Sequence, residues 1–225
     1  MATDWNADTL RRAALHGVLS DPVRLAIVDR LAWSDASPSE LGGRLGLASN
    51  LLAHHVGVLV ENGIVRRTRS EGDRRRIYLS MVHEALAGVV GPDGSSRNPP
   101  PRVVFVCTAN SARSQLAAAV WRRQTTLPVA SAGTHPAARV APGAVRIARR
   151  HRLPSLGAPS LLADVLTAGD YVVTVCDRAH EELAVAASHW SVPDPVPRGD
   201  DDAFEAALAV IERRVGDLAP RLGAS

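Results

Sequence analysis

The sequence has 225 residues and a formal net charge of +3 at neutral pH, with 46% hydrophobic and only 4% aromatic residues. This length suits two small domains, each able to bury its own core. No signal peptide and no run of 18 apolar residues is present, which excludes a membrane span and leads us to expect a cytoplasmic protein. Because the net charge is small, any binding to nucleic acid must depend on local basic patches.

Three helices are predicted in the first half of the chain. The first begins at Asp21 and carries apolar residues at helical spacing. The second opens at Ser37 with a capping-box pattern and a proline at its first position, and Gly46 ends it. Residues 50–62 form the third, which Gly63 ends. The last two helices, joined by a short turn that contains glycine, predict a helix-turn-helix.

A basic β-hairpin is predicted directly after the third helix. Two short strands, residues 64–69 and 74–79, flank a polar turn at residues 70–73. Residues 66–76 contain six arginines against two acidic residues, a local surplus of four positive charges. An edge strand protected by charge would explain this composition. Beside a helix-turn-helix, however, a wing that grips DNA phosphates is the better interpretation.

Residues 50–65, NLLAHHVGVLVENGIV, resemble the recognition helix of the ArsR family of winged-helix repressors. The resemblance extends over nearly all of residues 1–90 and implies a mainly α winged helix-turn-helix domain that binds double-stranded operator DNA. Family members dimerise, so a homodimer is implied, with half-sites roughly 34–36 Å apart. The predicted DNA-binding residues are Ser49, Asn50, Ala53, His54, Arg66, Arg67, Arg69, Arg74, Arg75 and Arg76.

No metal site is expected in this half of the chain. Many ArsR relatives sense metals or trivalent arsenic through cysteines, and residues 1–98 contain none. His54 and His55 are adjacent in a helix and do not share a face, so a metal pair is a weak interpretation. His83 and Glu84 are too sparse for a site. We therefore expect neither a metal nor a cofactor.

A linker is predicted at residues 91–101, which lack apolar periodicity and end in three prolines that stiffen it. Beyond it, residues 107–114, CTANSARS, follow the apolar run 103–106 and precede a helical pattern that begins at Gln115. A strand, a tight loop and a helix in this order form an oxyanion-binding unit. The loop N–H groups converge on the anion, and the helix N-terminus adds partial positive charge.

The residue types in this loop fit that chemistry. Arg113 can hold two oxygens of one anion. The same field favours a thiolate, so we expect Cys107 to have a lowered pKa and to act as a nucleophile. A buried structural cysteine is the alternative, but it leaves Asn110, Arg113 and Ser114 in one turn unexplained. The predicted oxyanion-binding residues are Thr108, Ala109, Asn110, Ser111, Ala112, Arg113 and Ser114.

These residues resemble the low-molecular-weight protein tyrosine phosphatase superfamily, and more closely its thioredoxin-coupled arsenate reductase branch. The resemblance covers residues 102–225 and implies an α/β three-layer domain with a parallel sheet. Residues 131–134 look like the end of the family's second strand, and residues 171–176 like the strand that carries the reductases' second cysteine. Residues 189–195 look like the loop that carries the family's general acid.

That general acid would be Asp194. A leaving oxygen needs a proton, which a carboxyl group on a loop can deliver. Pro195 restricts the backbone of Asp194 and helps to aim the side chain. A solvated turn is the alternative interpretation, since Pro-Asp-Pro is good turn chemistry. The oxyanion loop favours the acid.

Cys176 distinguishes a reductase from a phosphatase. A phosphatase needs one cysteine, whereas the resemblance to arsenate reductases implies that Cys176 attacks the Cys107–arsenic adduct and leaves a Cys107–Cys176 disulfide. The chain has only these two cysteines. After Asp194-Pro195 stands Val196, where the phosphatase branch typically has an aromatic residue that stacks on phosphotyrosine. Both observations favour arsenate over a phosphoester, although phosphate remains an alternative anion.

Three positions depart from the reductase pattern. Leu183 stands where a third cysteine is expected, Ala112 stands in the loop where cysteine is frequent, and an acidic residue that helps to hold potassium is replaced near Ala118. Without the third cysteine, the reductant would be thioredoxin acting directly or a low-molecular-weight thiol. Three functions stay open: a reductase that also regulates transcription, a sensor in which oxyanion binding or oxidation changes DNA affinity, and a tyrosine phosphatase.

Overall fold

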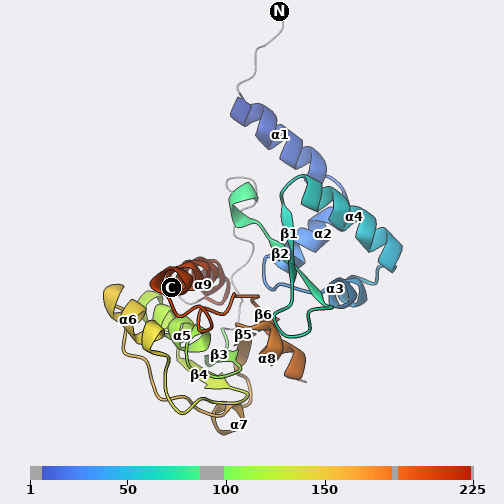
Figure 1. Ribbon diagram of the computed structural model, residues 1–225. Helices are drawn as coiled ribbons and strands as arrows, with labels where there is room; N and C mark the ends of the chain where they lie inside the picture. Colours follow the sequence, from blue (N-terminus) through green and yellow to red (C-terminus); the bar gives the residue numbers. More distant parts are fainter. Residues whose placement is uncertain (1–6, 87–98, 184–186, 224–225) are drawn as a thin grey trace, which may run out of the picture. The chain divides into compact units, whose positions relative to one another are not determined.

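A computed structural model describes residues 7–86, 99–183 and 187–223 (Figure 1). The chain divides into two compact units, one built mainly from the first 91 residues and the other mainly from the remainder. Most of the predicted linker, residues 91–98, lies outside the described residues. Within those residues, no helix is long and apolar enough to cross a membrane.

Within residues 7–86, the first unit contains four helices, a two-stranded hairpin and a short 3₁₀ turn. In chain order they are α1 Ala7–Leu19, α2 Pro22–Leu31, α3 Pro38–Leu45, α4 Ser49–Glu61, β1 Val65–Arg69, β2 Ile77–Met81 and η1 His83–Leu86. Helix α1 is absent from the sequence-based prediction, which begins at α2. Few apolar side chains mark a buried face of this helix: Leu15 and Leu19 are buried, whereas Leu10 is exposed.

Local capping fixes the ends of α2 and α3. The Asp21 side chain accepts hydrogen bonds from the backbone N–H groups of Val23 and Arg24 at 2.9 and 3.0 Å. At α3, Ser37 and Glu40 form the predicted capping box, each side chain accepting from the other residue's backbone N–H. Gly46 ends α3 with φ at 64°, a left-handed conformation that suits glycine. The helix-turn-helix geometry therefore starts from short-range hydrogen bonds.

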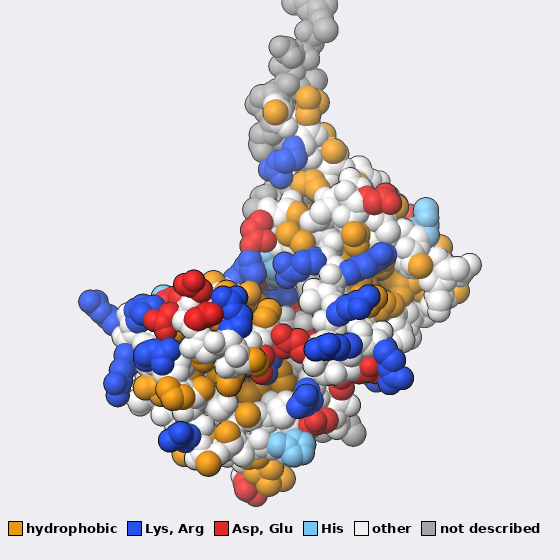
Figure 2. Space-filling view, in the orientation of Figure 1, with side chains coloured by type: hydrophobic (Ala, Val, Ile, Leu, Met, Phe, Trp, Pro, Cys, Tyr) orange, Lys and Arg blue, Asp and Glu red, His pale blue; other side chains and the backbone are white. Residues whose placement is uncertain are grey.

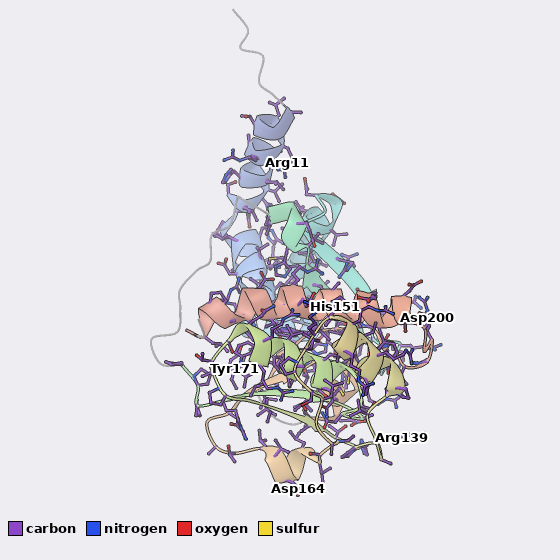
Figure 3. All side chains as sticks on the ribbon, turned by 90° about the vertical axis from the view of Figure 1, so that its left-hand side faces the viewer. Arg11, Arg139, His151, Asp164, Tyr171 and Asp200 are labelled. Atoms are coloured by element: carbon purple, nitrogen blue, oxygen red, sulfur yellow. The ribbon has the colours of Figure 1, made fainter. Side chains whose placement is uncertain are left out.

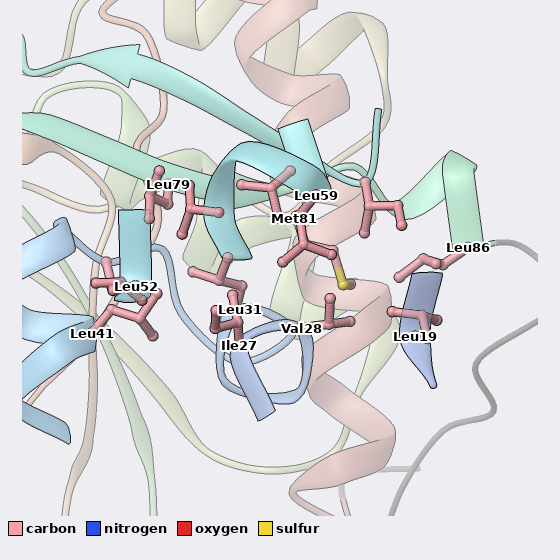
Figure 4. Packing of buried hydrophobic residues seen from close by; sticks show 14 of the residues in the cluster. Leu19, Ile27, Val28, Leu31, Leu41, Leu52, Leu59, Leu79, Met81 and Leu86 are labelled. Atoms are coloured by element: carbon pink, nitrogen blue, oxygen red, sulfur yellow. The ribbon is translucent and has the colours of Figure 1, made fainter. Parts of the chain in front are cut away.

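Apolar side chains from every element of this unit meet in one core. Leu19 comes from α1, Ile27 and Leu31 from α2, and Leu59 from α4 (Figure 4). Ile27, Leu31 and Leu59 have no exposed surface. Burying a side chain of this size stabilises a fold by roughly 1.5–3 kcal/mol. The core holds α4 by one face and leaves its other face exposed.

The hairpin differs from the prediction at its second strand. Strands β1 and β2 pair antiparallel, with Val65 opposite Met81 and Arg69 opposite Ile77. Strand β2 begins at Ile77 rather than at residue 74, so Arg74, Arg75 and Arg76 precede the strand. The apolar residues that the core can bury begin at Tyr78, and this sets the pairing register.

The second unit alternates strands and helices. In chain order they are β3 Val103–Cys107, α5 Arg113–Gln124, β4 Val129–Gly133, α6 Pro142–Arg150, α7 Leu162–Val165, β5 Tyr171–Thr174, α8 Asp177–Glu182, β6 Ser188–His189 and α9 Asp201–Arg221. The four strands form a parallel sheet in the order β4-β3-β5-β6. The predicted fold class is therefore confirmed for both halves.

Helices cover both faces of this sheet. All five residues of β3 are buried, as expected for a central parallel strand. Phe105 on β3 contacts Trp121 on α5 and Trp190 after β6, with ring centroids 5.8 and 5.5 Å apart. Figure 3 shows α9, which follows Asp200, on one side of the sheet and α7, marked by Asp164, on the other. Because the strands are parallel, their carboxyl ends lie at one edge of the sheet, and the candidate site lies at this edge.

Candidate oxyanion site and nucleic-acid surface

The predicted oxyanion loop lies at the carboxyl end of the central strand. Cys107 is the last residue of β3, and α5 begins at Arg113, two residues earlier than the pattern predicts. Ala112 precedes the helix and makes no side-chain cap. The first amide groups of α5 therefore lack a side-chain acceptor and can serve a bound anion.

Hydrogen-bonding groups of the loop converge on the Cys107 sulfur. The backbone N–H of Asn110 donates to Sγ at 3.2 Å, and the Ser114 hydroxyl lies 3.0 Å from Sγ. Cys107 is only 2% exposed. The thiol is thus fixed in a polar cradle at the base of the loop, as a nucleophile must be.

Asn110 and its neighbours hold the loop in shape. Asn110 has a φ of 47°, in the left-handed region that asparagine tolerates better than most residues. Its side-chain amide donates to the Ser114 hydroxyl at 2.8 Å. Its carbonyl oxygen accepts from the Ser160 backbone N–H at 2.9 Å and from the Gln115 amide at 3.2 Å. Sequence reasoning missed Gln115, whose role depends on a loop about 40 residues away in sequence.

The end of β4 also shapes the loop. Gly133 pairs with Cys107 in the sheet register. A Cβ atom at Gly133 would lie 2.6 Å from the carbonyl oxygen of Thr108 and 3.0 Å from the backbone nitrogen of Asn110. Such distances are too short for any side chain, so the loop can follow this path only because residue 133 is glycine.

Arg113 joins the oxyanion loop to the loop of the predicted acid. Its guanidinium donates to the Asp194 carboxylate at 2.8 Å and to the Val192 carbonyl at 3.0 Å. Burial alone would lower the pKa of Arg113, but the nearby Cys176, Asp194 and Cys107 raise it, and the side chain stays charged. The structure therefore brings Arg113 and Asp194 together.

Cys176 lies beyond β5 rather than within it, which corrects the sequence-based assignment. Strand β5 ends at Thr174, and Cys176 caps α8 by accepting a hydrogen bond from the Ala179 backbone N–H at 3.4 Å. The Cys176 sulfur also lies 3.4 Å from the Thr108 hydroxyl. Burial raises the pKa of the Cys176 thiol, an effect that Arg113 partly offsets. Both cysteines are free thiols.

These residues line one pocket. The described part of its wall includes Cys107, Thr108, Ala109, Ser111, Ala112, Arg113, Cys176, Asp194, Val196 and Pro197. No aromatic side chain belongs to the described lining of this pocket. Among the described residues, no group of three or more His, Cys, Asp or Glu side chains is arranged to hold a metal ion. The pocket's chemistry is that of a charged cradle with two thiols.

Apart from Arg74, the predicted DNA-binding residues lie on the surface of the first unit. Ser49, Asn50, Ala53 and His54 are exposed along α4, whereas the adjacent His55 is buried. Figure 2 shows basic side chains gathered over this unit. All six arginines of the predicted wing are exposed: Arg66, Arg67, Arg69, Arg74, Arg75 and Arg76.

Part of this set meets in one groove. Ser49 and Ala53 of α4 line it together with Arg67 of β1 and with Arg75 and Arg76 before β2. A helix face and a row of arginines thus border the same hollow, an arrangement suited to DNA bases on one side and phosphates on the other.

Comparison with known families decides the classification of the larger unit. A model described as low molecular weight phosphotyrosine protein phosphatase matches residues 102–225, more than half of the chain. The chain belongs to this phosphatase family. A helix-turn-helix domain model matches residues 19–68, which include α2, α3 and α4. The phosphatase-family chain therefore carries a helix-turn-helix domain before its α/β domain.

Solved structures with similar folds include both reductases and phosphatases. An arsenate reductase from Archaeoglobus fulgidus is 29% identical, with 52% of this chain and 98% of that chain covered and a TM-score of 0.47. The thioredoxin-dependent arsenate reductase of Corynebacterium glutamicum is 24% identical, with 57% and 64% covered and a TM-score of 0.46. The tyrosine phosphatase Wzb from Escherichia coli K30 is 20% identical, with 55% and 99% covered and a TM-score of 0.49. No curated protein matches the chain.

Proposed function

We propose that this phosphatase-family chain is a DNA-binding transcriptional regulator of the ArsR type whose second domain reduces arsenate with two thiols. The observation that carries the reductase assignment is the place of Cys176. Its sulfur lies 3.4 Å from the hydroxyl of Thr108, the residue that follows Cys107, and both cysteines line the same pocket. Phosphoester hydrolysis requires only one thiol, whereas release of arsenite from a Cys107 adduct requires a second.

The proposed chemistry begins at Cys107. Its thiolate attacks the arsenic of arsenate and forms an S–As bond. One arsenate hydroxyl leaves as water with a proton from Asp194, which acts in its protonated form in this step. Arg113 and the loop N–H groups bind the remaining oxygens. The Cys176 thiolate then attacks the Cys107 sulfur. The S–As electron pair stays with arsenic, so arsenite leaves and a Cys107–Cys176 disulfide remains.

Recycling requires a reductant. Thioredoxin, or a low-molecular-weight thiol in two equivalents, returns both cysteines to thiols by exchange. Leu183 occupies the position at which the reductase resemblance implies a third cysteine. The reductant must therefore react with the Cys107–Cys176 disulfide itself.

Tyrosine phosphatase activity is the second candidate, and the family membership favours it. Cys107, Arg113 and Asp194 suffice for that reaction, with water completing it. The pocket rim argues against phosphotyrosine as the substrate. Val196 at the rim is 43% exposed, and the described lining has no aromatic side chain to stack on a phenol ring. A small inorganic oxyanion fits this wall better.

Arsenite release by the purified protein separates these functions. We expect the wild type to release arsenite from arsenate with thioredoxin or a small thiol. With thioredoxin and no small thiol, Cys176→Ser should release none and hold at most one arsenic per chain as the Cys107 adduct, because the S–As bond then has no resolving thiol. Arsenite is measured by arsenic-specific chromatography. Absence of release from the wild type contradicts the reductase. Hydrolysis of an aryl phosphate that is unchanged in Cys176→Ser supports the phosphatase only if arsenite is absent as well.

For the first domain we propose that α4 enters the major groove and that the wing arginines grip phosphates, with a homodimer reading two half-sites. The groove shared by Ser49, Ala53, Arg67, Arg75 and Arg76 supports this proposal. If oxidation of the thiols or arsenate binding changes operator affinity, the second domain also acts as a sensor. Unchanged affinity under both conditions would remove that role.

The salt dependence of DNA binding tests the wing. Arg67→Ala and Arg75→Ala should each weaken binding to a random-sequence duplex and reduce the slope of log affinity against log salt by about 0.9, because each lost phosphate contact releases one counterion fewer. Arg146→Ala is the matched control, since Arg146 lies in the second unit and pairs with Asp201. Wild-type slopes in both wing variants would contradict phosphate contacts by these residues.

A further inference from the structure

A buried histidine–aspartate pair lies next to Cys176, since Asp177 follows Cys176 in the chain and lines the same pocket. The Nε2 atom of His189 lies 3.1 Å from Oδ1 of Asp177. The two side chains are 0% and 2% exposed. Burial opposes the ionisation of Asp177, but hydrogen bonds, that from His189 the largest among them, hold the pKa of this carboxyl below its usual value. A charged carboxylate in the interior is costly without a partner, so this contact has a structural purpose.

The other side of the His189 ring is fixed as well. Its Nδ1 atom lies 2.9 Å from the hydroxyl of Thr174, the last residue of β5. Thr174 and His189 are paired in the register of β5 and β6. The ring also stacks on His180 of α8 at a centroid distance of 4.2 Å and an angle of 11°. His189 therefore connects the end of β5, the edge strand β6 and helix α8.

The connection matters because Asp177 is the neighbour of Cys176 in sequence. Between Thr174 and α8, Cys176 is held in an extended conformation, with φ at −156° and ψ at 147°. Helix α8 has only six residues and cannot fix its own first turn without tertiary contacts. The ring of His189 therefore contacts the chain on both sides of Cys176: it bonds to Thr174, two residues before Cys176, and to Asp177, the residue after it.

We propose that the His189–Asp177 pair is the positioning element of Cys176, which holds that thiol against Thr108 and within reach of the Cys107 sulfur. The inference deepens the proposed two-thiol function and rests on it for its biological meaning. Neither His189 nor Asp177 need take part in bond making. A displacement of about 1 Å at a reacting atom can slow a reaction by ~10²-fold, so loss of this positioning contact should strongly lower the rate of disulfide formation.

The rate at which diamide oxidises Cys107 and Cys176 to a disulfide tests the positioning role of the His189–Asp177 pair without arsenate. Diamide takes one hydrogen from each of two thiols and is reduced to the hydrazine while the Cys107–Cys176 bond forms. We expect His189→Leu to slow this step about tenfold or more, whereas binding of inorganic phosphate, which depends on the oxyanion loop and Arg113, should stay at the wild-type level. His189→Gln should recover much of the rate, because its amide can still donate to Asp177. His151→Gln, at a surface histidine that contacts Glu205, is the control.

Each outcome bears on the proposal. Wild-type disulfide rates in both His189→Leu and Asp177→Asn would overturn it, as would a His189→Gln variant no faster than His189→Leu. Should His189→Leu fail to fold, Asp177→Asn, which keeps the shape of the side chain and removes its charge, gives the same comparison. A slow disulfide step in a protein that releases no arsenite would refute the proposed reductase and leave the positioning role supported.

Discussion

Cys107→Ser is expected to lose both aryl-phosphate hydrolysis and arsenite release, each by at least ~10⁴-fold, the scale seen when an enzyme's nucleophile is removed. The physical reason lies in the loop. Donors from Asn110 and Ser114 converge on the sulfur, and a serine hydroxyl at the same place is a far weaker nucleophile without a base to take its proton. The loop itself should keep its shape, because the Asn110 side chain bonds to Ser114 and Ser160 rather than to the sulfur, and the close approach at Gly133 is unchanged.

The measurement compares initial rates for p-nitrophenyl phosphate and for arsenate in Cys107→Ser, Cys176→Ser and the wild type. Binding of inorganic phosphate, followed by calorimetry, reports whether the cradle is intact. We expect phosphate binding to persist in Cys107→Ser while both reactions disappear. Hydrolysis at a wild-type rate in Cys107→Ser would show that the reaction proceeds elsewhere in the molecule and would contradict the assignment of the site.

Arg113→Lys is expected to lower kcat/KM for aryl phosphate by roughly 10²–10³-fold, the typical effect of removing one donor from an oxyanion site. Arg113 is 8% exposed and contacts both Asp194 and the Val192 carbonyl. Its planar group can hold two anion oxygens and still remain near the acid loop. A lysine ammonium is a compact charge that cannot make these contacts together, so the exchange is not conservative here.

The same variant should weaken inorganic phosphate binding, and the loss should be larger in kcat/KM than in binding if Arg113 acts mainly in the transition state. Arg146→Lys is the matched control. Arg146 is an exposed arginine that pairs with Asp201, and a surface pair of this kind contributes at most about 1 kcal/mol. An Arg113→Lys enzyme with wild-type kinetics would contradict the role of Arg113 in binding the anion.

Sequence reasoning succeeded where short-range chemistry determines the structure. The cap of α2 at Asp21 and the capping box of α3 involve residues only two or three positions apart, and both are present. The stretch from Cys107 to Ser114 likewise contains most of its own loop geometry, so strand, loop and helix follow in the predicted order. The fold class of each half followed from the family resemblances of residues 50–65 and 107–114.

The remaining features depend on contacts between distant segments. Whether β2 starts at residue 74 or at Ile77 is set by what the core can bury, not by the arginine run. Cys176 could not be placed beyond its strand, because the end of β5 is determined by pairing with β3. Gln115 and His189 gained their roles from partners about 40 and 12 residues away, a relation that no local pattern encodes.

The strand order of the sheet has a consequence for how such a site can change. The chain crosses from β3 to β4 on one side and then returns to β5 on the other, so the segments after β3 and β5 diverge from a topological switch point. Cys107 is the last residue of β3, and Cys176 lies two residues beyond the end of β5. On the proposed chemistry, the segment after β3 binds the oxyanion, and Cys176 in the segment after β5 determines whether the reaction ends in hydrolysis or in reduction. A change at position 176 would then remove the reduction while Cys107, Arg113 and the loop amides that bind the anion stay in place.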